Sequence, residues 1–407
     1  MTTNFAAYLD DQDLIRMEGG ESVMASLPFT LTSGSKTIEL LPTEEEKTLR
    51  SPLPIDLSQS YTLSNAKGET CLLHYRDIVR QPIFDQLYAY DGEDLGARYS
   101  KEKTTFAFWA PISQEVQLLI NQTAYPMERT EKGVWRLELE GDWEKASYYY
   151  QHQVNGVTHI VHDPYALSSE ANSGASYVVD RHKIERPIQR ATTQLDPTQA
   201  IIYELSVRDF SMQKEAGFHH PGTFPALLES PKHGEQTFGF DYLKSLGITH
   251  IQLLPLYDFG SVDETNPTAG YNWGYDPVQY NVPEGSFSSQ PNDPYQRILE
   301  LQQVIDAYHK ADLSLIMDVV YNHVYLSDEF AFERIVPGYF YRYDQDRQRT
   351  NGTFCGNDVA SERAMVRNYI KQSVKQWVQL YGFDGFRFDL MGILDRQIMM
   401  EIQEELG

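Results

Sequence analysis

From residue 198 onward, short apolar runs typical of strands alternate with longer stretches whose apolar residues recur every three to four positions. The apolar runs fall at about 201–207, 249–254, 313–319 and 385–389. Runs of this kind between amphipathic helices are typical of parallel strands that are buried on both faces. The βαβαβαβ order therefore predicts a sheet of four parallel strands joined by helices.

Two of the amphipathic stretches carry recognisable helix boundaries. Asp293 can cap a helix that begins at Pro294, because proline needs no backbone N–H at that position. A second helix is expected to stop at Gly382, since glycine adopts the left-handed conformation of a helix end at little cost. The apolar residues of both helices share one face and are expected in the core: Ile298, Leu301, Ile305 and Tyr308 in the first, and Val366, Ile370, Val374, Trp377 and Tyr381 in the second.

The first 185 residues have a different sequence pattern, in which short runs typical of β-strands are separated by Gly, Pro and Asn. We expect an amino-terminal β domain over residues 1–91 and a second β-sandwich over 92–185. Segment 186–197 has two prolines and no sustained period, which indicates a linker. The predicted architecture is thus two β-sandwich domains followed by an α/β domain over 198–407.

Charge and composition exclude several classes of function. The 407 residues include 58 Asp and Glu and 34 Lys and Arg, a net charge of −24. Such a surface repels phosphate backbones and anionic lipids, so nucleic-acid and membrane partners are not expected. No stretch approaches the ~20 apolar residues of a bilayer span. The amino terminus lacks the basic and apolar segments of a signal peptide, which predicts a cytoplasmic location.

The positions of the cysteines and of the acidic residues in the sequence do not indicate a metal site or a cofactor site. Cys71 and Cys355 are the two cysteines, 284 positions apart, which suggests neither a disulfide framework nor a zinc site. We expect two reduced thiols. No group of Asp and Asn has the spacing of a calcium loop, so no metal and no cofactor are expected.

Polar residues collect where two of the predicted strands end. Asp318 follows one apolar run and leads to His323, and Arg387 and Asp389 interrupt the last run. Positions i and i+2 of a strand share a face, so Arg387 and Asp389 should point the same way. A carboxylate beside a guanidinium stays ionised, as a nucleophile must. A purely structural ion pair fits this segment equally well. Because polar residues fall at the same end of two successive predicted strands, a functional site is favoured there.

Four segments resemble those of known carbohydrate-active enzymes. DVVYNH at 318–323 and GFRFDLMG at 385–392 resemble the first two signature regions of the α-amylase family of retaining glycoside hydrolases. YNWGYDP at 271–277 resembles the hallmark of type I pullulanases, the debranching enzymes that cleave α-1,6 linkages in pullulan and branched dextrins. LGARYSKEKTTFAFWAP, from residue 95, resembles the start of the carbohydrate-binding β-sandwich that precedes the barrel in such enzymes.

The resemblance implies a role for each residue of the two strand ends. Asp389 matches the nucleophile that forms the covalent glycosyl-enzyme intermediate, and Arg387 the residue that orients it. His323 matches a residue that hydrogen-bonds the sugar in the cleaved subsite. Asp318 matches a buried organiser of the site, and Tyr275 matches the tyrosine that stacks under that sugar.

The same resemblance gives secondary roles to the hallmark loop. Asn272, Trp273 and Asp276 are expected to shape this loop and the neighbouring subsites. For Trp109, within FAFWAP, we expect a place in the core of the sandwich rather than a starch-binding platform.

One element of the family's chemistry has no match. A retaining glycosidase needs a second carboxyl group about 5 Å from the nucleophile to protonate the leaving oxygen. In the family this acid is a Glu on the strand after the nucleophile, whereas the 18 residues after Asp389 predict a helix. Glu401, Glu404 and Glu405 belong to that helix. Four strands are half of a (β/α)8 TIM barrel, so we expect a fragment that lacks the general acid and is inactive alone.

The expected partners are a branched α-glucan (pullulan, glycogen or limit dextrins) and the carboxyl-terminal half of the barrel. Two alternatives stay open. One is an isoamylase or branching-type enzyme, which shares the sandwich, the barrel and the nucleophile. The other is a noncatalytic α-glucan-binding fragment. The heptapeptide at 271–277 favours pullulanase over isoamylase and branching enzymes.

Overall fold

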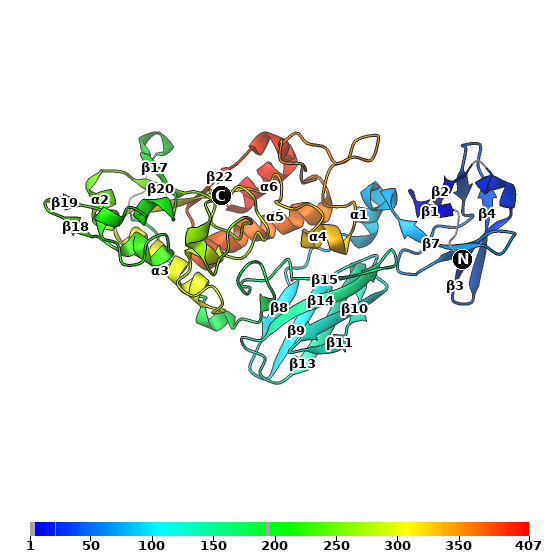
Figure 1. Cartoon of the computed structure of the whole chain (residues 1–407), viewed down its shortest axis with the longest axis horizontal. Coiled ribbons are helices and arrows are strands. Elements are labelled where there is room, and N and C mark those ends of the chain that lie inside the picture. The colour runs from blue at the N-terminus through cyan, green and yellow to red at the C-terminus, as the bar shows by residue number, and fades with distance from the viewer. Residues whose placement is uncertain (1–4, 21, 193–195, 407) are drawn as a thin grey trace.

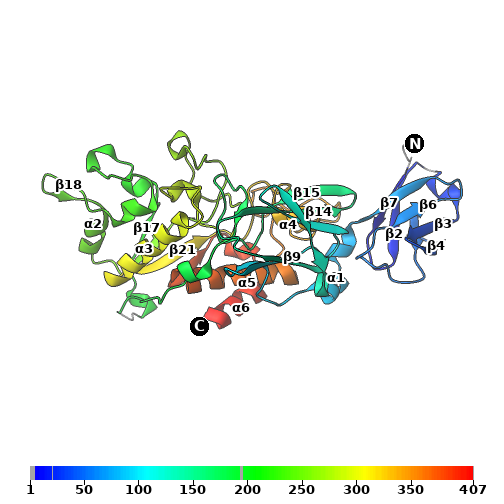
Figure 2. The same cartoon turned by 90° about the horizontal axis from the view of Figure 1, so that it is seen from below.

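The computed structural model describes residues 5–20, 22–192 and 196–406. These residues form an elongated molecule, with a β unit from the amino terminus at one end and an α/β unit at the other (Figure 1). A β-sandwich lies against the middle of the long axis, and the view from below shows the same order (Figure 2). Among the described residues, no helix is both long and apolar enough to cross a bilayer.

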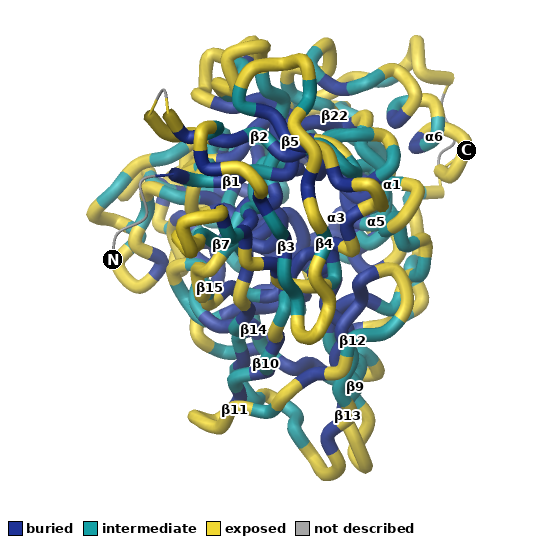
Figure 3. Tube along the Cα trace, turned by 90° about the vertical axis from the view of Figure 1, so that its right-hand side faces the viewer, coloured by how far each residue is buried: buried dark blue, intermediate teal, exposed yellow. Residues whose placement is uncertain are grey.

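The amino-terminal unit is a closed barrel, so the prediction of a sandwich was wrong for this domain. Its strands are β1 (Phe5–Leu9), β2 (Leu14–Gly19), β3 (Phe29–Ser33), β4 (Lys36–Pro42), β5 (Thr48–Arg50), β6 (Thr62–Ser64) and β7 (Thr70–Tyr75). They pair in the order β1-β2-β5-β4-β3-β6-β7. Figure 3 views the molecule from this end, with most of these strands labelled. The barrel closes because β1 pairs in parallel with β7, with Ala7 opposite Leu73. Closure of this kind removes the exposed edges of the sheet.

The second unit is a two-sheet sandwich, as expected. Its strands are β8 (Gly96–Tyr99), β9 (Lys103–Trp109), β10 (Glu115–Ile120), β11 (Thr123–Pro126), β12 (Glu128–Arg129), β13 (Val134–Glu140), β14 (Ser147–Val154), β15 (Val157–Val161) and β16 (Ser176–Tyr177). One sheet has the order β11-β10-β14-β15, with β16 on β14, and the other has the order β12-β13-β9-β8. Between the sheets the rings of Phe108 and Tyr150 stack, with centroids 4.2 Å apart.

Trp109 is a packing residue rather than a binding platform, as predicted, but it packs outside the core that lies between the two sheets. Its side chain is 3% exposed. The indole N–H donates to the carbonyl of Tyr88, at the end of helix α1 (Pro82–Tyr88), over 2.9 Å. Its ring also packs on Phe332 and Tyr339 of the α/β unit. Trp109 thus joins the sandwich to both neighbouring parts of the chain.

The α/β unit contains the four parallel strands that the sequence predicts. They are β17 (Ile202–Leu205), β20 (His250–Leu253), β21 (Ser314–Val319) and β22 (Gly385–Phe388), in that spatial order. Every neighbouring pair is parallel, with Asp318 opposite Arg387 in the pairing of β21 with β22. A separate two-stranded hairpin consists of β18 (Lys232–His233) and β19 (Gln236–Thr237).

The helices of this unit are α2 (Gly239–Ser245), α3 (Gln296–Lys310), α4 (Ala331–Ile335), α5 (Ala364–Gln376) and α6 (Arg396–Leu406). Helix α3 begins two residues later than predicted, yet Asp293 still accepts the backbone N–H groups of Tyr295 and Gln296. Helix α5 continues into a π turn and stops at Gly382, which has φ 97° as the helix end requires. Both predicted apolar faces are buried.

The segment between the sandwich and the first parallel strand runs along the α/β unit. Arg186 forms a bidentate pair with Asp306 of α3, over 2.7 and 2.9 Å, and donates to the carbonyl of Leu380. Arg190 pairs with Asp384 just before β22, over 2.7 Å. These contacts attach the segment to the strand that carries Arg387.

Candidate active site

The carboxyl ends of β21 and β22 bring two acidic residues onto one guanidinium. Asp318 and Arg387 are direct neighbours in the sheet. Arg387 Nη1 lies 3.1 Å from both carboxyl oxygens of Asp318 and 2.9 Å from Asp389 Oδ1. Asp318 is fully buried, whereas the side chain of Arg387 is 43% exposed. Arg387 therefore joins the buried carboxylate of Asp318 to that of Asp389, which directly follows the carboxyl end of β22.

Tyr275 extends this chain of contacts from the hallmark loop. Its hydroxyl donates to Asp318 Oδ2 over 2.7 Å. Burial raises the pKa of Asp318, although the hydrogen bonds from Tyr275 and Arg387 oppose this shift. Burial and the neighbouring Asp318 also raise the pKa of the Tyr275 hydroxyl, which therefore stays a donor at neutral pH. Tyr275, Asp318, Arg387 and Asp389 form one continuous polar cluster.

Asn322 is a member of this cluster that the sequence did not single out. Its Nδ2 donates to the backbone carbonyl of Asp389 over 2.8 Å and lies 3.3 Å from Asp389 Oδ2. The backbone N–H of Asp389 donates to Val319, which keeps the chain in line with β21. Asn322 thus fixes both the backbone and the carboxylate of Asp389. The only sequence signal was its place beside His323 in DVVYNH.

His323 lies in the cluster with both ring nitrogens in contact with protein oxygens. Nδ1 is 2.6 Å from Asn322 Oδ1, and Nε2 is 2.7 Å from the carbonyl oxygen of Tyr275. Burial lowers the pKa of His323, although the charge of Asp389 opposes this shift. The ring therefore holds the hallmark loop against β21, and a hydrogen bond to a sugar requires one of these contacts to open.

The hallmark loop is held by its own side chains. Asn272 donates to Asp276 and to the carbonyl of Gly260, and its Oδ1 accepts the N–H of Gly274. Gly274 has φ 93°, and a Cβ there would lie 2.8 Å from the carbonyl oxygen of Pro255. Only glycine satisfies both constraints. Burial raises the pKa of Asp276, and the bond from Asn272 opposes this shift.

Two aromatic side chains of the same loop remain open to solvent. Trp273 is 59% exposed and Tyr271 is 55% exposed. The indole N–H of Trp273 donates to the hydroxyl of Tyr271, which in turn donates to Asp209. Arg208 lies over the Tyr271 ring. These rings are available for stacking on a ligand, whereas Asn272 and Asp276 serve the loop itself.

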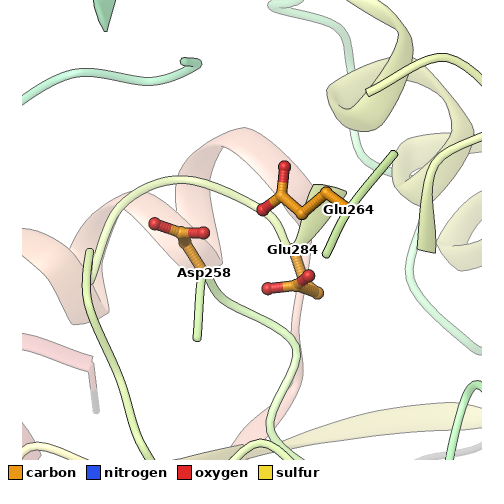
Figure 4. Close-up of side chains that lie close together, drawn as sticks. All are labelled: Asp258, Glu264 and Glu284. Carbon is orange, nitrogen blue, oxygen red and sulfur yellow. The ribbon is translucent and has the colours of Figure 1, made fainter. Parts of the chain in front are cut away.

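Three further buried carboxyl side chains lie close to one another (Figure 4). In the described part of the chain, Asp258, Glu264 and Glu284 are the three acidic residues whose oxygens all lie within 4.8 Å of one another. Burial raises the pKa of Asp258 and Glu284 well above the usual range, and the charge of Glu264 adds to both shifts. The buried Arg297 lies 3.3 Å from Glu264. These are the described residues that could hold a hard cation, and their wide spacing in the sequence hid them.

Two parts of the chain match known protein families. Residues 94–166 match the carbohydrate-binding module 48 family (isoamylase N-terminal domain), and residues 237–346 match the alpha amylase catalytic domain. Over 99% of its length the chain is 35% identical to the pullulanase of Bacillus subtilis (strain 168). The chain is a pullulanase homologue.

Solved pullulanases have the same fold as this homologue. The pullulanase of Anoxybacillus sp. LM18-11 in complex with maltotetraose superposes with a TM-score of 0.93 at 40% identity over 98% of the chain. The type I pullulanase of Bacillus subtilis str. 168 in complex with maltose gives 0.93 at 34% identity over the whole chain. The chain spans 58% of the Bacillus subtilis sequence and 59% of each solved chain. The sequence-based assignment to this family is confirmed.

Proposed function

We propose that the chain forms part of a retaining glycoside hydrolase of the pullulanase type, which cleaves α-1,6 linkages of branched α-glucans. The observation that carries this proposal is the cluster in which Arg387 holds Asp389 beside the buried Asp318 and Tyr275. A carboxylate at the open end of a parallel strand and next to a guanidinium is suited to attack an anomeric carbon.

In this proposal Asp389 is the nucleophile, and Arg387 orients its carboxylate through the 2.9 Å contact with Oδ1. Asn322 fixes the carboxylate through its amide. Tyr275 presents its ring beneath the sugar at the cleaved subsite, and His323 takes a sugar hydroxyl when its contact with the Tyr275 carbonyl opens. Trp273, with the neighbouring Tyr271, lines an adjacent subsite.

We further propose that the four-stranded sheet is the first half of a (β/α)8 barrel. Strands β17 and β22 lie at the two edges of the sheet and pair on one side only. Ile202 of β17 is 51% exposed, and Leu390 and Met391 after β22 are 45% and 54% exposed. Four further strands would pair with both edges and cover these apolar side chains.

The general acid is assigned to residues outside this chain. Asp318 is the carboxyl group that shares Arg387 with Asp389, and its two oxygens are occupied by Arg387 and Tyr275. Glu401, on the helix after β22, is paired with Lys371 of α5 over 3.0 Å. The proposed proton donor is therefore a carboxylic acid from the second half of the barrel.

The isoamylase alternative has weaker support than the pullulanase assignment. The chain is 29% identical to Isoamylase 3 of Oryza sativa over 50% of its length. Its identity to the Bacillus subtilis pullulanase is 35% over 99% of its length, amino-terminal barrel included. We therefore propose pullulan-type substrates ahead of isoamylase substrates.

The test is pullulan hydrolysis by the 407-residue chain, alone and mixed with the carboxyl-terminal part of the Bacillus subtilis pullulanase. We expect reducing ends only in the mixture, with maltotriose as the product, and no activity when the chain carries Asp389→Asn. Turnover in the mixture that survives Asp389→Asn would refute the assigned nucleophile. Binding of pullulan without turnover in any mixture would favour the noncatalytic alternative.

A further inference from the structure

Phe354 is the most exposed large apolar side chain in the described part of the chain. Its side chain is 91% exposed, whereas Leu53, the next in order, is 61% exposed. The backbone of Phe354 has φ 60°, in the left-handed region that bulky residues rarely adopt. This conformation is costly for a residue with a Cβ, and a ring so exposed gains almost no packing to offset the cost. Packing within this chain therefore does not explain a phenylalanine at this position.

The loop that carries Phe354 is fixed by hydrogen bonds on both sides of this residue. Asp358, which is buried, accepts the N–H groups of Gly352 and Thr353 over 2.8 Å each. The hydroxyl of Thr353 donates to the carbonyl of Asn357 over 2.7 Å. The backbone of Phe354 is therefore held by its neighbours rather than by its own ring.

The same loop is attached to the end of β21, beside Asp389. Asn357 and Val324 exchange two hydrogen bonds of 2.9 Å. The N–H of Val359 donates to the carbonyl of Asn322, whose side-chain amide contacts Asp389. Strand β21 is an inner strand of the sheet, with β20 and β22 on its two sides. The loop is therefore anchored at an inner strand and not at an edge to which further strands would pair.

Two further observations place the tip of this loop near Asp389. Burial raises the pKa of the Cys355 thiol, and the charge of Asp389 adds to this shift. On the other side of Phe354, a Cβ on Gly352 would lie 3.2 Å from Ile393, which follows β22. The residues around Phe354 thus reach from β21 to the segment after β22, the strand whose end carries Asp389.

We propose that Phe354 binds substrate by stacking its ring on a glucose unit of an α-glucan held at the cluster around Asp389. This proposal rests on the proposed function, from which it takes the substrate class. One face of a pyranose presents C–H groups, which pack on the face of an aromatic ring. A ring whose backbone is already fixed loses little conformational entropy on binding. In the complex, this stacking offsets the cost of the positive φ.

The test is affinity electrophoresis of the 407-residue chain in gels that contain pullulan, for the parent and three variants. Phe354→Asn removes the ring but tolerates positive φ, and Phe354→Trp keeps an aromatic face. We expect Phe354→Asn to weaken pullulan binding about five- to tenfold and Phe354→Trp to stay within about twofold of the parent. The matched control is Leu246→Asn, which removes an exposed apolar side chain between α2 and the amino end of β20 and should leave binding unchanged.

Thermal unfolding of the same variants separates binding from stability. The ring has almost no packing to lose, and asparagine adopts positive φ more readily than phenylalanine. Phe354→Asn should therefore unfold at the temperature of the parent or above it. A lower unfolding temperature would contradict the absence of packing on which the proposal depends.

Three results in the binding assay would overturn the proposal. The first is pullulan binding that Phe354→Asn leaves unchanged. The second is the same result with weaker association of this variant with the carboxyl-terminal part of the Bacillus subtilis pullulanase, which would assign the ring to the barrel interface. The third is the absence of pullulan binding by the parent, alone and in the mixture. Because no readout here depends on turnover, hydrolysis that survives Asp389→Asn would refute the nucleophile and leave the role of Phe354 standing.

Discussion

The hydroxyl of Tyr275 donates a 2.7 Å hydrogen bond to Oδ2 of Asp318, a residue 43 positions further along the chain. This contact attaches the loop at 271–277 to the end of β21, beside the ion pair of Arg387 with Asp389. It makes the hallmark heptapeptide and the two strand ends parts of one cluster.

Replacement of Tyr275 by Phe should lower the free energy of unfolding by about 1–2 kcal/mol, because the buried Asp318 loses one of its donors. The pKa of Asp318, already raised by burial, should rise further. Urea denaturation and carboxyl titration by NMR measure the two effects. Tyr271→Phe is the matched control, since its hydroxyl also donates to an aspartate but in solvent. Equal losses for the two variants would contradict the assigned role of Tyr275.

Replacement of Gly274 by Ala should destabilise the hallmark loop by about 2–4 kcal/mol through positive φ and a backbone clash. Gly217→Ala separates the two causes, because Gly217 has φ 79° but its Cβ would meet no atom within 4 Å. The difference between the two variants in chemical denaturation reports the clash alone. If both variants lose the same amount, the loop is not packed against Pro255 as described.

Glu333 should make stability depend on pH. Burial raises its pKa from 4.5 to about 7, against the opposing effect of Arg349. The folded state therefore binds the proton of Glu333 more tightly than the unfolded state does. The stabilisation that this proton provides is complete below pH 4.5 and is lost as the pH rises to about 7. The loss is on the order of 3 kcal/mol.

The measurement is the free energy of unfolding at several pH values for the parent chain and Glu333→Gln. The neutral amide retains an acceptor for the N–H of Gly338. The stability of the variant relative to the parent should therefore rise between pH 4.5 and about 7. A difference that is flat across this window would mean that Glu333 titrates at its ordinary pKa.

The 407-residue chain, assayed by itself, should bind branched α-glucans weakly and not hydrolyse pullulan. General acid help is typically worth 10²–10⁴-fold, and the positioning supplied by a complete barrel adds to this factor. Reducing-end assays and affinity electrophoresis measure the two properties. Pullulan cleavage by the isolated chain that Asp389→Asn abolishes would prove that a proton donor exists within these residues.

Local periodicity was enough to predict the parallel sheet and the helices that cover it. The strands that carry Asp318 and Arg387 pair in parallel, with these two residues opposite each other. This was predictable because parallel strands joined by helices end at the same edge of the sheet. The face shared by Arg387 and Asp389 followed from the two-residue repeat of a strand. These features depend on neighbours in the sequence.

Features that depend on distant pairing were not predictable. The amino-terminal barrel closes through the pairing of β1 with β7, and its short alternating strands fit a sandwich equally well. The role of Asn322 depends on where the backbone of Asp389 lies. The group of Asp258, Glu264 and Glu284 forms only when two loops fold onto each other. No local pattern marks such contacts.

Covalent trapping shows directly whether Asp389 is the nucleophile. A 5-fluoro-α-maltosyl fluoride needs no proton donor for its leaving group, and its ring fluorine slows release of the glycosyl-enzyme intermediate. The chain, mixed with the carboxyl-terminal part of a pullulanase, is treated with this reagent, digested and analysed by mass spectrometry. We predict one glycosyl adduct, on Asp389, that Asp389→Asn eliminates. An adduct on Asp318, or one that persists in Asp389→Asn, would contradict the assignment of Asp389 as the nucleophile.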